Sequence, residues 1–335
     1  MTQDRQDQYD VVVIGGGAAG LGGALMLARS RRSVVVVDGG QPRNAPAAGV
    51  HGYLTRDGMP PAELLRTGRL EVEGYGGRVL DGQVDRVERL DDGRLAVSLA
   101  DGRTLTGRRL LVATGLVDEL PDVPGVQERW GRDVVHCPYC HGWEVRDQAI
   151  GVLASGPMSV HQALLFRQLS DDVTYFSHTL PPAAEQQEQL TARGIRIVGD
   201  AVAGLQVEQD RLTGVRLADG GVVRCTTLVV ATRMEARTGF LAGLGLAPVE
   251  HALGVGQHLT ADPQGRTDLP GVWVAGNVTD LSAQVGAAAA AGAAAGAAIN
   301  GDLVMEETRV AVDALRTDAS SGEVRTPAAQ TAGAR

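Results

Sequence analysis

Residues 9–20 read YDVVVIGGGAAG, and this short stretch decides the fold. Residues 9–14 form a near-continuous apolar run, which is typical of a parallel strand buried on both faces. The run leads into a glycine-rich turn and then into a stretch of small residues and leucine that favours a helix to about Arg31. A second apolar run, residues 33–38, ends in a carboxylate. The order strand, glycine turn, helix and strand predicts an α/β fold.

Three glycines in this turn, Gly15, Gly17 and Gly20, have the spacing G-x-G-x-x-G. The first permits a tight turn, the second lets the backbone approach a pyrophosphate, and the third lets helix and strand pack closely. The N–H groups at the start of the helix favour negatively charged phosphates. Asp38, at the end of the second strand, can accept hydrogen bonds from a ribose. The N-terminal segment is therefore predicted to bind a dinucleotide.

The same pattern recurs later in the chain. Residues 149–159, AIGVLASGPMS, read as a second strand, turn and helix, and residues 173–178 read as the strand that follows. Short strand-like pieces separated by turn residues occupy both 79–110 and 195–232, and the two sets close on the similar strands LLVAT and LVVAT. We therefore expect two Rossmann-like nucleotide-binding domains, each of the three-layer ββα kind, with the second inserted in the first.

The order of these patterns sets the domain boundaries. We place the first domain at residues 1–117 and 243–307, and the inserted domain at residues 118–242. A strand within 269–277 returns the chain to the first domain, and the small-residue helix after it is expected to pack tightly on the cofactor. The polar residues 308–335 show no periodicity and are predicted to be a disordered tail.

Composition excludes several classes of partner. The chain has 335 residues, a length typical of two domains, and a net charge of −9 with no run of basic residues, so nucleic acid is not expected to bind. All 31 basic residues are arginine, which excludes chemistry based on lysine.

The polar N-terminus does not resemble a secretory signal. The alanine and glycine run at 285–299 is too short and too weakly apolar to span a membrane. A cytoplasmic location is expected.

Residues 136–143 read HCPYCHGW and contain two of the three cysteines. Because structural thiols stay reduced in the cytoplasm, a C-x-x-C pair there favours redox chemistry or metal binding. Zinc held by both cysteines with His136 and His141 is less favoured, because adjacent side chains cannot easily all reach one ion and no second C-x-x-C is present. A structural disulfide is the other alternative. The third cysteine, Cys225, is expected in the core.

Together, GGGAAG, ATG at 113–115, the C-x-x-C pair and GVWVAGN at 271–277 resemble the low-molecular-weight thioredoxin reductase family. The resemblance covers roughly residues 9–304 and implies FAD in the first domain, a redox dithiol beside it, and a homodimer. It implies that Cys140 faces the flavin and that Cys137 exchanges with the thiol substrate. The residues that it places at FAD are Gly15, Gly17, Ala18, Ala19, Gly20, Asp38, Gly39, Arg43, Asn44, Ala113, Thr114, Gly115, Gly276, Asn277, Gln284 and Val285.

The sequence departs from this family around the dithiol. His141 replaces the usual aspartate after the second cysteine, and an imidazole with an ordinary pKa near ~6.5 suits a base that takes a thiol proton. His141 could instead be a helix cap or a surface residue. The cysteines enclose Pro138 and Tyr139 instead of small residues, and Asn277 stands where the family has aspartate. His51 could line the substrate pocket or simply belong to a loop, and Arg43 could contact the cofactor or lie in a solvated turn.

The second domain departs where NADPH would bind. The glycine expected at the first turn is Ala154, and Pro157 lacks an N–H where a pyrophosphate would need one. The segment that would hold the 2′-phosphate reads HTLPP at 178–182, with no basic residue before Arg193. We therefore expect that the inserted domain no longer binds NADPH well.

A flavoprotein with a dithiol but without a nicotinamide site resembles the flavin-dependent dithiol oxidases of holomycin- and gliotoxin-type biosynthesis. This resemblance implies that a small dithiol is oxidised through Cys137 and Cys140, with His141 as base and with oxygen reduced to hydrogen peroxide. A thioredoxin reductase-like enzyme, driven by NADPH or a ferredoxin-like donor and acting on a thioredoxin-like protein, is the alternative. A redox-sensing flavoprotein without enzyme activity is also possible, although the intact C-x-x-C argues against it.

Overall fold

The computed structural model describes residues 7–321, and it confirms an α/β fold with two domains. The first domain is built on a seven-stranded sheet of order β3-β2-β1-β6-β5-β4, with β19 beside β6. Its strands are β1 (Gln8–Ile14), β2 (Val34–Asp38), β3 (Arg78–Asp81), β4 (Val84–Arg89), β5 (Leu95–Leu99), β6 (Thr104–Val112) and β19 (Val272–Val274). The strands β1, β2, β3 and β19 run parallel to their neighbours, whereas β4, β5 and the first half of β6 form an antiparallel meander.

Three helices belong to this domain: α1 (Ala18–Arg29), α2 (Pro61–Gly74) and α7 (Val285–Ser321). Glycines let the backbones of α7 and α1 touch, because a Cβ on Gly292 would stand 1.8 Å from the carbonyl oxygen of Ala19. Only residues at the start of α7, including Val285 and Ala288, line the cavity described below. The small-residue helix therefore packs mainly on α1, while its first turn lines the cavity, so its packing on the cofactor stays a prediction.

Helix α7 is also much longer than expected. It continues to Ser321, so the prediction of disorder is wrong for residues 308–321, while residues 322–335 lie outside the described part of the chain. The apolar stretch is correspondingly longer than residues 285–299, and by length and composition alone this helix could cross a membrane. Its residues Ala295, Ile299 and Leu303 are nevertheless buried in the first domain's core, as in a helix that packs on a sheet.

The inserted domain contains a parallel five-stranded sheet of order β11-β10-β9-β15-β8 and an antiparallel sheet of order β12-β13-β14. The strands are β8 (Val134–Val135), β9 (Ile150–Leu153), β10 (Val173–Phe176), β11 (Arg196–Val198), β12 (Val202–Glu208), β13 (Arg211–Leu217), β14 (Val222–Arg224) and β15 (Thr227–Val230). Its helices are α3 (Val126–Arg129), α4 (Pro138–His141), α5 (Ser159–Phe166) and α6 (Ala184–Ala192). Cys225 lies fully inside this domain's core, as expected.

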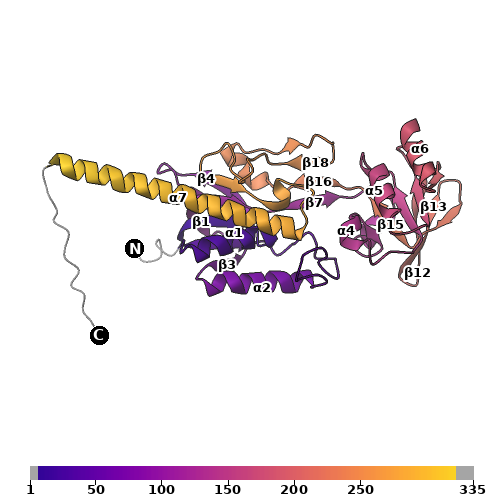
Figure 1. Ribbon diagram of the computed structural model, residues 1–335, viewed down its shortest axis with the longest axis horizontal. Coiled ribbons are helices and arrows are strands. Elements are labelled where there is room, and N and C mark those ends of the chain that lie inside the picture. The colour runs from indigo at the N-terminus through magenta and orange to yellow at the C-terminus, as the bar shows by residue number, and fades with distance from the viewer. Residues whose placement is uncertain (1–6, 322–335) are drawn as a thin grey trace.

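Two strands connect the domains, as Figure 1 shows. The chain leaves the first domain through β7 (Leu116–Glu119) and returns through β16 (Arg233–Ala236), which pair antiparallel beside β18 (Gly256–His258) and β17 (Val249–Glu250). The short helix η1 (Gly239–Leu244) follows, and Leu241 is buried in the first domain's core. The insert therefore ends before residue 239, earlier than the predicted boundary at residue 242. A second short helix, η2 (Gly276–Val278), follows β19.

Candidate active site

A single cavity of about 1070 Å³ is lined by both domains. Residues 14–19 and 113–116 line it from the first domain, and residues 136–141 and 155–158 line it from the inserted domain. This volume lies at the upper end of the usual range for small-molecule sites, as an extended dinucleotide beside a substrate requires. Every residue predicted to contact FAD lines this cavity except Gly20.

The glycine turn has the geometry that its spacing requires. Gly15 has a φ of +109°, and a Cβ there would stand 2.3 Å from the carbonyl oxygen of Ala113. A Cβ on Gly20 would stand 1.8 Å from the carbonyl oxygen of Gly15, so this glycine permits the close contact of helix and turn and does not itself reach the cavity. A Cβ on Gly17 would meet no other atom of residues 7–321 within 4 Å, which leaves space for a ligand against the backbone.

Asp38 lies at the adenosine end predicted for FAD, and it is already oriented by the protein. Its Oδ1 accepts a hydrogen bond of 3.1 Å from the backbone N–H of Gly40, and its Oδ2 accepts from the guanidinium of Arg69. Arg69 also donates to Asp81 at 2.9 Å. Sequence reasoning did not find α2, which carries Arg69, because no motif marks that helix.

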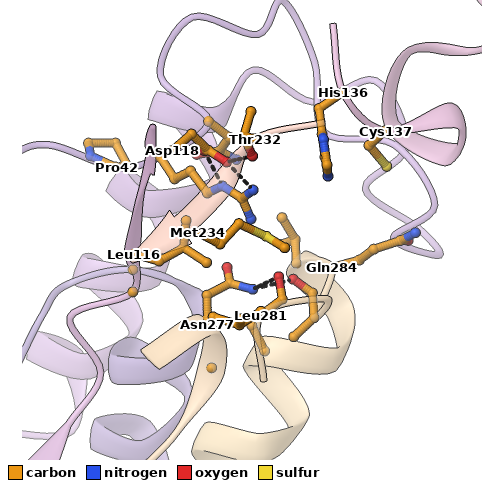
Figure 2. A pocket seen from close by; sticks show the side chains of 18 of the residues that line it. Pro42, Leu116, Asp118, His136, Cys137, Thr232, Met234, Asn277, Leu281 and Gln284 are labelled. Atoms are coloured by element: carbon orange, nitrogen blue, oxygen red, sulfur yellow. Dashed lines mark hydrogen bonds and ion pairs between the residues drawn. The ribbon is translucent and has the colours of Figure 1, made fainter. Parts of the chain in front are cut away.

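Arg43 is tied to a buried carboxylate. Its Nε and Nη2 donate to the two oxygens of Asp118 at 2.6 and 2.7 Å, and the hydroxyl of Thr232 donates to the same carboxylate at 2.7 Å (Figure 2). Burial alone would raise the pKa of Asp118, but Arg43 more than offsets it, so the pKa lies below its ordinary value. The predicted cofactor residue Arg43 thus lines the cavity and is at the same time ion-paired with Asp118. No local pattern in the sequence marks Asp118 as its partner.

The carboxamide of Asn277 has a defined orientation. Its Nδ2 donates to the carbonyl oxygens of Asp280 and Ala283 at 3.0 and 2.9 Å. Figure 2 shows the remaining carboxamide oxygen turned away from these carbonyls and towards Met234, on the cavity side. An acceptor fixed in this way can receive a hydrogen bond from a hydroxyl group of a bound flavin nucleotide. Asparagine in place of the family's aspartate therefore remains compatible with FAD.

The dithiol lies in the wall of the same cavity. Cys137 and Cys140 are joined by a disulfide, with 5.3 Å between their Cα atoms, and both are half-buried. Pro138 opens the short helix α4, where its fixed φ is suitable, and Cys137 caps it: Sγ accepts from the backbone N–H of Cys140 at 3.2 Å. Figure 2 shows Cys137 and His136 projecting from the inserted domain on the side of Gln284, which precedes α7.

His141 ends α4, and its imidazole is largely enclosed. Neither ring nitrogen is exposed to solvent, and neither has a hydrogen-bond partner among residues 7–321. Burial lowers the pKa of His141 below its ordinary value, so the ring is neutral at pH 7. Burial also lowers the pKa of His136, whose Nδ1 lies 3.1 Å from the carbonyl oxygen of Val230 and 3.3 Å from Nε2 of Gln162.

In the inserted domain, the turn between β9 and α5 is held by the side chain of Ser159. The backbone N–H groups of Ser155 and Gly156 donate to the buried hydroxyl of Ser159 at 3.2 and 3.1 Å. In addition, Ser155 Oγ donates to the carbonyl oxygen of Ala231 at 2.9 Å. Two backbone donors of this turn are therefore already paired within it. At the other predicted phosphate position, His178 Nδ1 accepts from the N–H of Val202 at 3.0 Å.

Two further residues lie at or near the cavity: His51, for which the sequence left two interpretations, and Glu144, which the sequence did not single out. His51 lines the cavity and does not merely fill a loop, and Nε2 of its ring lies 3.5 Å from Oε1 of Glu144 in the inserted domain. Glu144 stands three residues after His141, but no motif singles it out. Within residues 7–321, no group of three or more His, Cys, Asp or Glu side chains is arranged to hold a metal ion.

Comparison with known proteins agrees with this geometry. The model of the family "Pyridine nucleotide-disulphide oxidoreductase" matches residues 9–297. The chain is 33% identical to "Thioredoxin reductase tcpT" of Claviceps purpurea (strain 20.1), over 80% of this chain and 86% of the relative. Among solved structures, HlmI is 48% identical with a TM-score of 0.87, over 94% of this chain and 98% of HlmI. An oxidoreductase from Agrobacterium tumefaciens is 34% identical with a TM-score of 0.82, over 89% of this chain and 99% of that protein.

Proposed function

The chain belongs to the pyridine nucleotide-disulphide oxidoreductase family, and from this premise we propose that it is an FAD-dependent dithiol oxidase. It is a flavin-dependent thiol/disulfide oxidoreductase, similar to thioredoxin reductases and to HlmI. The proposed reaction converts a small dithiol and oxygen into an intramolecular disulfide and hydrogen peroxide. Electrons enter from the thiol substrate through Cys137 and Cys140, and not from NADPH.

One observation carries the choice of an oxidase over an NADPH-driven reductase. The hydroxyl of Ser159 holds the N–H groups of Ser155 and Gly156, which a nicotinamide dinucleotide would need for its pyrophosphate. The neighbouring Pro157 has no N–H to offer. A redox dithiol in a protein that does not bind a nicotinamide nucleotide must receive its electrons from a thiol or from another protein. Because both cysteines are half-buried in a cavity wall, a small dithiol is favoured over a folded protein partner.

The side chains around the disulfide support a sequence of thiol exchanges. The neutral His141 takes the proton of one substrate thiol, and the resulting thiolate attacks Sγ of Cys137. The disulfide between the cysteines breaks, and Cys140 leaves as a thiolate. The second substrate thiol then attacks the substrate sulfur of the mixed disulfide and displaces Cys137. The cyclic disulfide is released, and the cysteine pair has gained two electrons.

Two features of the chain assist these steps. The N–H of Cys140 donates to Sγ of Cys137, and this hydrogen bond stabilises negative charge on Cys137 when that sulfur leaves. The ring nitrogens of His141 are buried without a partner among residues 7–321, which costs about 1–3 kcal/mol for such a polar group. A thiol that donates to one of them removes this cost, so binding of the substrate thiol and proton transfer are coupled at His141.

FAD, when bound, supplies the two-electron acceptor that returns the cysteine pair to its disulfide and delivers the electrons to oxygen. The chain would hold it at the turn that contains Gly15 and Gly17, at Asp38, and at the fixed carboxamide oxygen of Asn277. The N-terminal end of α7, which lines the cavity through Val285 beside Gln284, carries a positive dipole and would favour negative charge on a bound cofactor. We also propose a homodimer, as the resemblance to thioredoxin reductases implies, and a cytoplasmic location, as the composition suggests.

Oxygen consumption with dithiothreitol tests this function. The wild-type protein should consume oxygen and produce an equal amount of hydrogen peroxide, and Cys140→Ser should lower the rate at least 100-fold because the exchange disulfide is lost. Cys225→Ser is the matched control: this thiol is fully buried, burial raises its pKa to about 12, and its substitution should leave the rate unchanged. A Cys140→Ser protein that turns over dithiothreitol at the wild-type rate would contradict the proposal.

A further inference from the structure

A second imidazole, that of His51, faces the dithiol cavity from the opposite domain. It lies in the loop between Val50 and Met59, and this loop is closed by a β-bridge. The N–H of Val50 donates to the carbonyl oxygen of Met59 at 2.8 Å, and the N–H of Gly58 donates to that of Val50 at 2.8 Å. The loop therefore presents His51 from a fixed backbone.

A carboxylate faces each nitrogen of this ring. Nδ1 lies 3.5 Å from Oδ2 of Asp57, and Nε2 lies 3.5 Å from Oε1 of Glu144. Asp57 is itself aligned, because its Oδ1 accepts from the backbone N–H of Gly52 at 2.9 Å. This hydrogen bond lowers the pKa of Asp57, so the carboxylate is ionised at neutral pH. An imidazole oriented by a carboxylate in this way has the arrangement of a general base and its orienting partner.

The accessibility of His51 differs from that of His141. The ring nitrogens of His141 are shielded from solvent, whereas the His51 side chain is 25% exposed. The charged or titratable groups that face His51 are Asp57 on its own loop, Glu144 after α4, and His141 on α4. A dithiol carries two protons that must leave in sequence, and the cavity offers two imidazoles, one enclosed and one open to water.

We propose that His51 is the acid–base group for the second substrate thiol, an inference that rests on the proposed dithiol oxidase function. After the first thiolate has formed the mixed disulfide with Cys137, Nε2 of His51 takes the proton of the second thiol. That sulfur attacks the substrate sulfur, the bond to Cys137 breaks, and the electron pair leaves on Sγ of Cys137. His51 then passes the proton to water at the open edge of the cavity, while Asp57 and Glu144 stabilise the protonated ring.

The test compares a monothiol with a dithiol, because only the dithiol needs the second base. In the His51→Gln variant, 2-mercaptoethanol should form a mixed disulfide with Cys137 at the wild-type rate, measured by mass spectrometry of acid-quenched protein. Oxidation of dithiothreitol should fall about 100-fold in kcat, as is typical when a general base is lost.

Two further variants complete the design. Asp57→Asn should also lower kcat for dithiothreitol, by a smaller factor than His51→Gln, and should leave the monothiol step unchanged. This variant covers the case in which His51→Gln does not fold. Arg56→Gln is the matched control on the same loop. The guanidinium of Arg56 donates to the neighbouring carbonyl oxygen of Thr55 at 3.2 Å, and its substitution should change neither step.

The inference is overturned if His51→Gln oxidises dithiothreitol at the wild-type rate, or if it slows the monothiol step as much as the dithiol reaction. Failure of the proposed function itself gives a different result: the wild-type protein would then not oxidise dithiothreitol at all.

Discussion

Arg43 shows how a residue beside a ligand site can serve the protein itself. Its bidentate contact with Asp118 places opposite charges where the strand β7 leaves the first domain, and Thr232 adds a donor from the returning chain. The carboxylate is 5% exposed, whereas the guanidinium is 29% exposed. The pair therefore fixes the point at which the two domains join. Its loss would leave a buried carboxylate without its guanidinium partner, held by the neutral hydroxyl of Thr232.

Replacing Arg43 by glutamine should lower the free energy of unfolding by about 2 kcal/mol, less than for a fully buried pair because water screens the guanidinium. Urea unfolding of the FAD-saturated protein measures this change. Arg86→Gln is the control, since the pair of Arg86 with Glu88 is exposed and should contribute about 0.5 kcal/mol or less. Equal losses in the two variants would refute the structural role assigned to Arg43.

The residues that sequence reasoning could place are those with local patterns. Cys137, Cys140 and the glycines at 15, 17 and 20 act through fixed spacings, so their chemistry can be inferred from a few neighbouring letters. The pairing of Arg43 with Asp118, and that of His51 with Glu144, joins residues 75 and 93 positions apart through the fold. Such pairs depend on how the domains meet, and no periodicity in the sequence records them.

At the scale of elements, the contact between α1 and α7 depends on small residues. Gly292 and Gly296 of α7 lie so close to α1 that a Cβ on either would stand 1.8 or 2.6 Å from a carbonyl oxygen of that helix. Helix α1 begins at the turn that is predicted to hold the pyrophosphate. A shift of α1 away from α7 would therefore disturb the cofactor cradle, although neither glycine of α7 lines it.

The Gly292→Ala variant should retain much less FAD after purification than the wild type, because the methyl group forces α1 and α7 apart. The ratio of flavin to protein absorbance measures this loss. Gly301→Ala, in the same helix, is the control: its Cβ would meet no atom within 4 Å among residues 7–321, and alanine favours the helix. If both variants keep full FAD, the packing of α1 on α7 does not support the cofactor site.

The sequence predicts some elements better than others, for physical reasons. The strands β1, β2, β9 and β10 are short apolar runs next to turns, so their pattern is clear. Residues 307–318 of α7 are exposed, and their mixture of polar and apolar side chains resembles a tail. Helix α7 is attached near residue 306 by salt bridges from Arg108 and Arg109 of β6 to Glu306, contacts made across almost two hundred residues.

At the scale of the whole molecule, the two domains share one cavity, and the disulfide lies in the part contributed by the inserted domain. The first domain carries the predicted cradle for FAD. In the inserted domain, the hydroxyl of Ser159 accepts hydrogen bonds from the N–H groups of Ser155 and Gly156, in the turn where a second dinucleotide would be expected. Under the proposed function, the insert serves mainly to carry Cys137 and Cys140 to the flavin. This division of roles is the central claim, because it decides where electrons enter.

An anaerobic titration of the purified yellow protein tests that claim most directly. Flavin absorbance is followed while NADPH is added to one sample and dithiothreitol to another. The account predicts that dithiothreitol bleaches the flavin, that NADPH does not, and that admitting air restores the colour with formation of hydrogen peroxide. Prompt bleaching by NADPH would contradict the account and would show that the inserted domain still delivers electrons from a nicotinamide nucleotide.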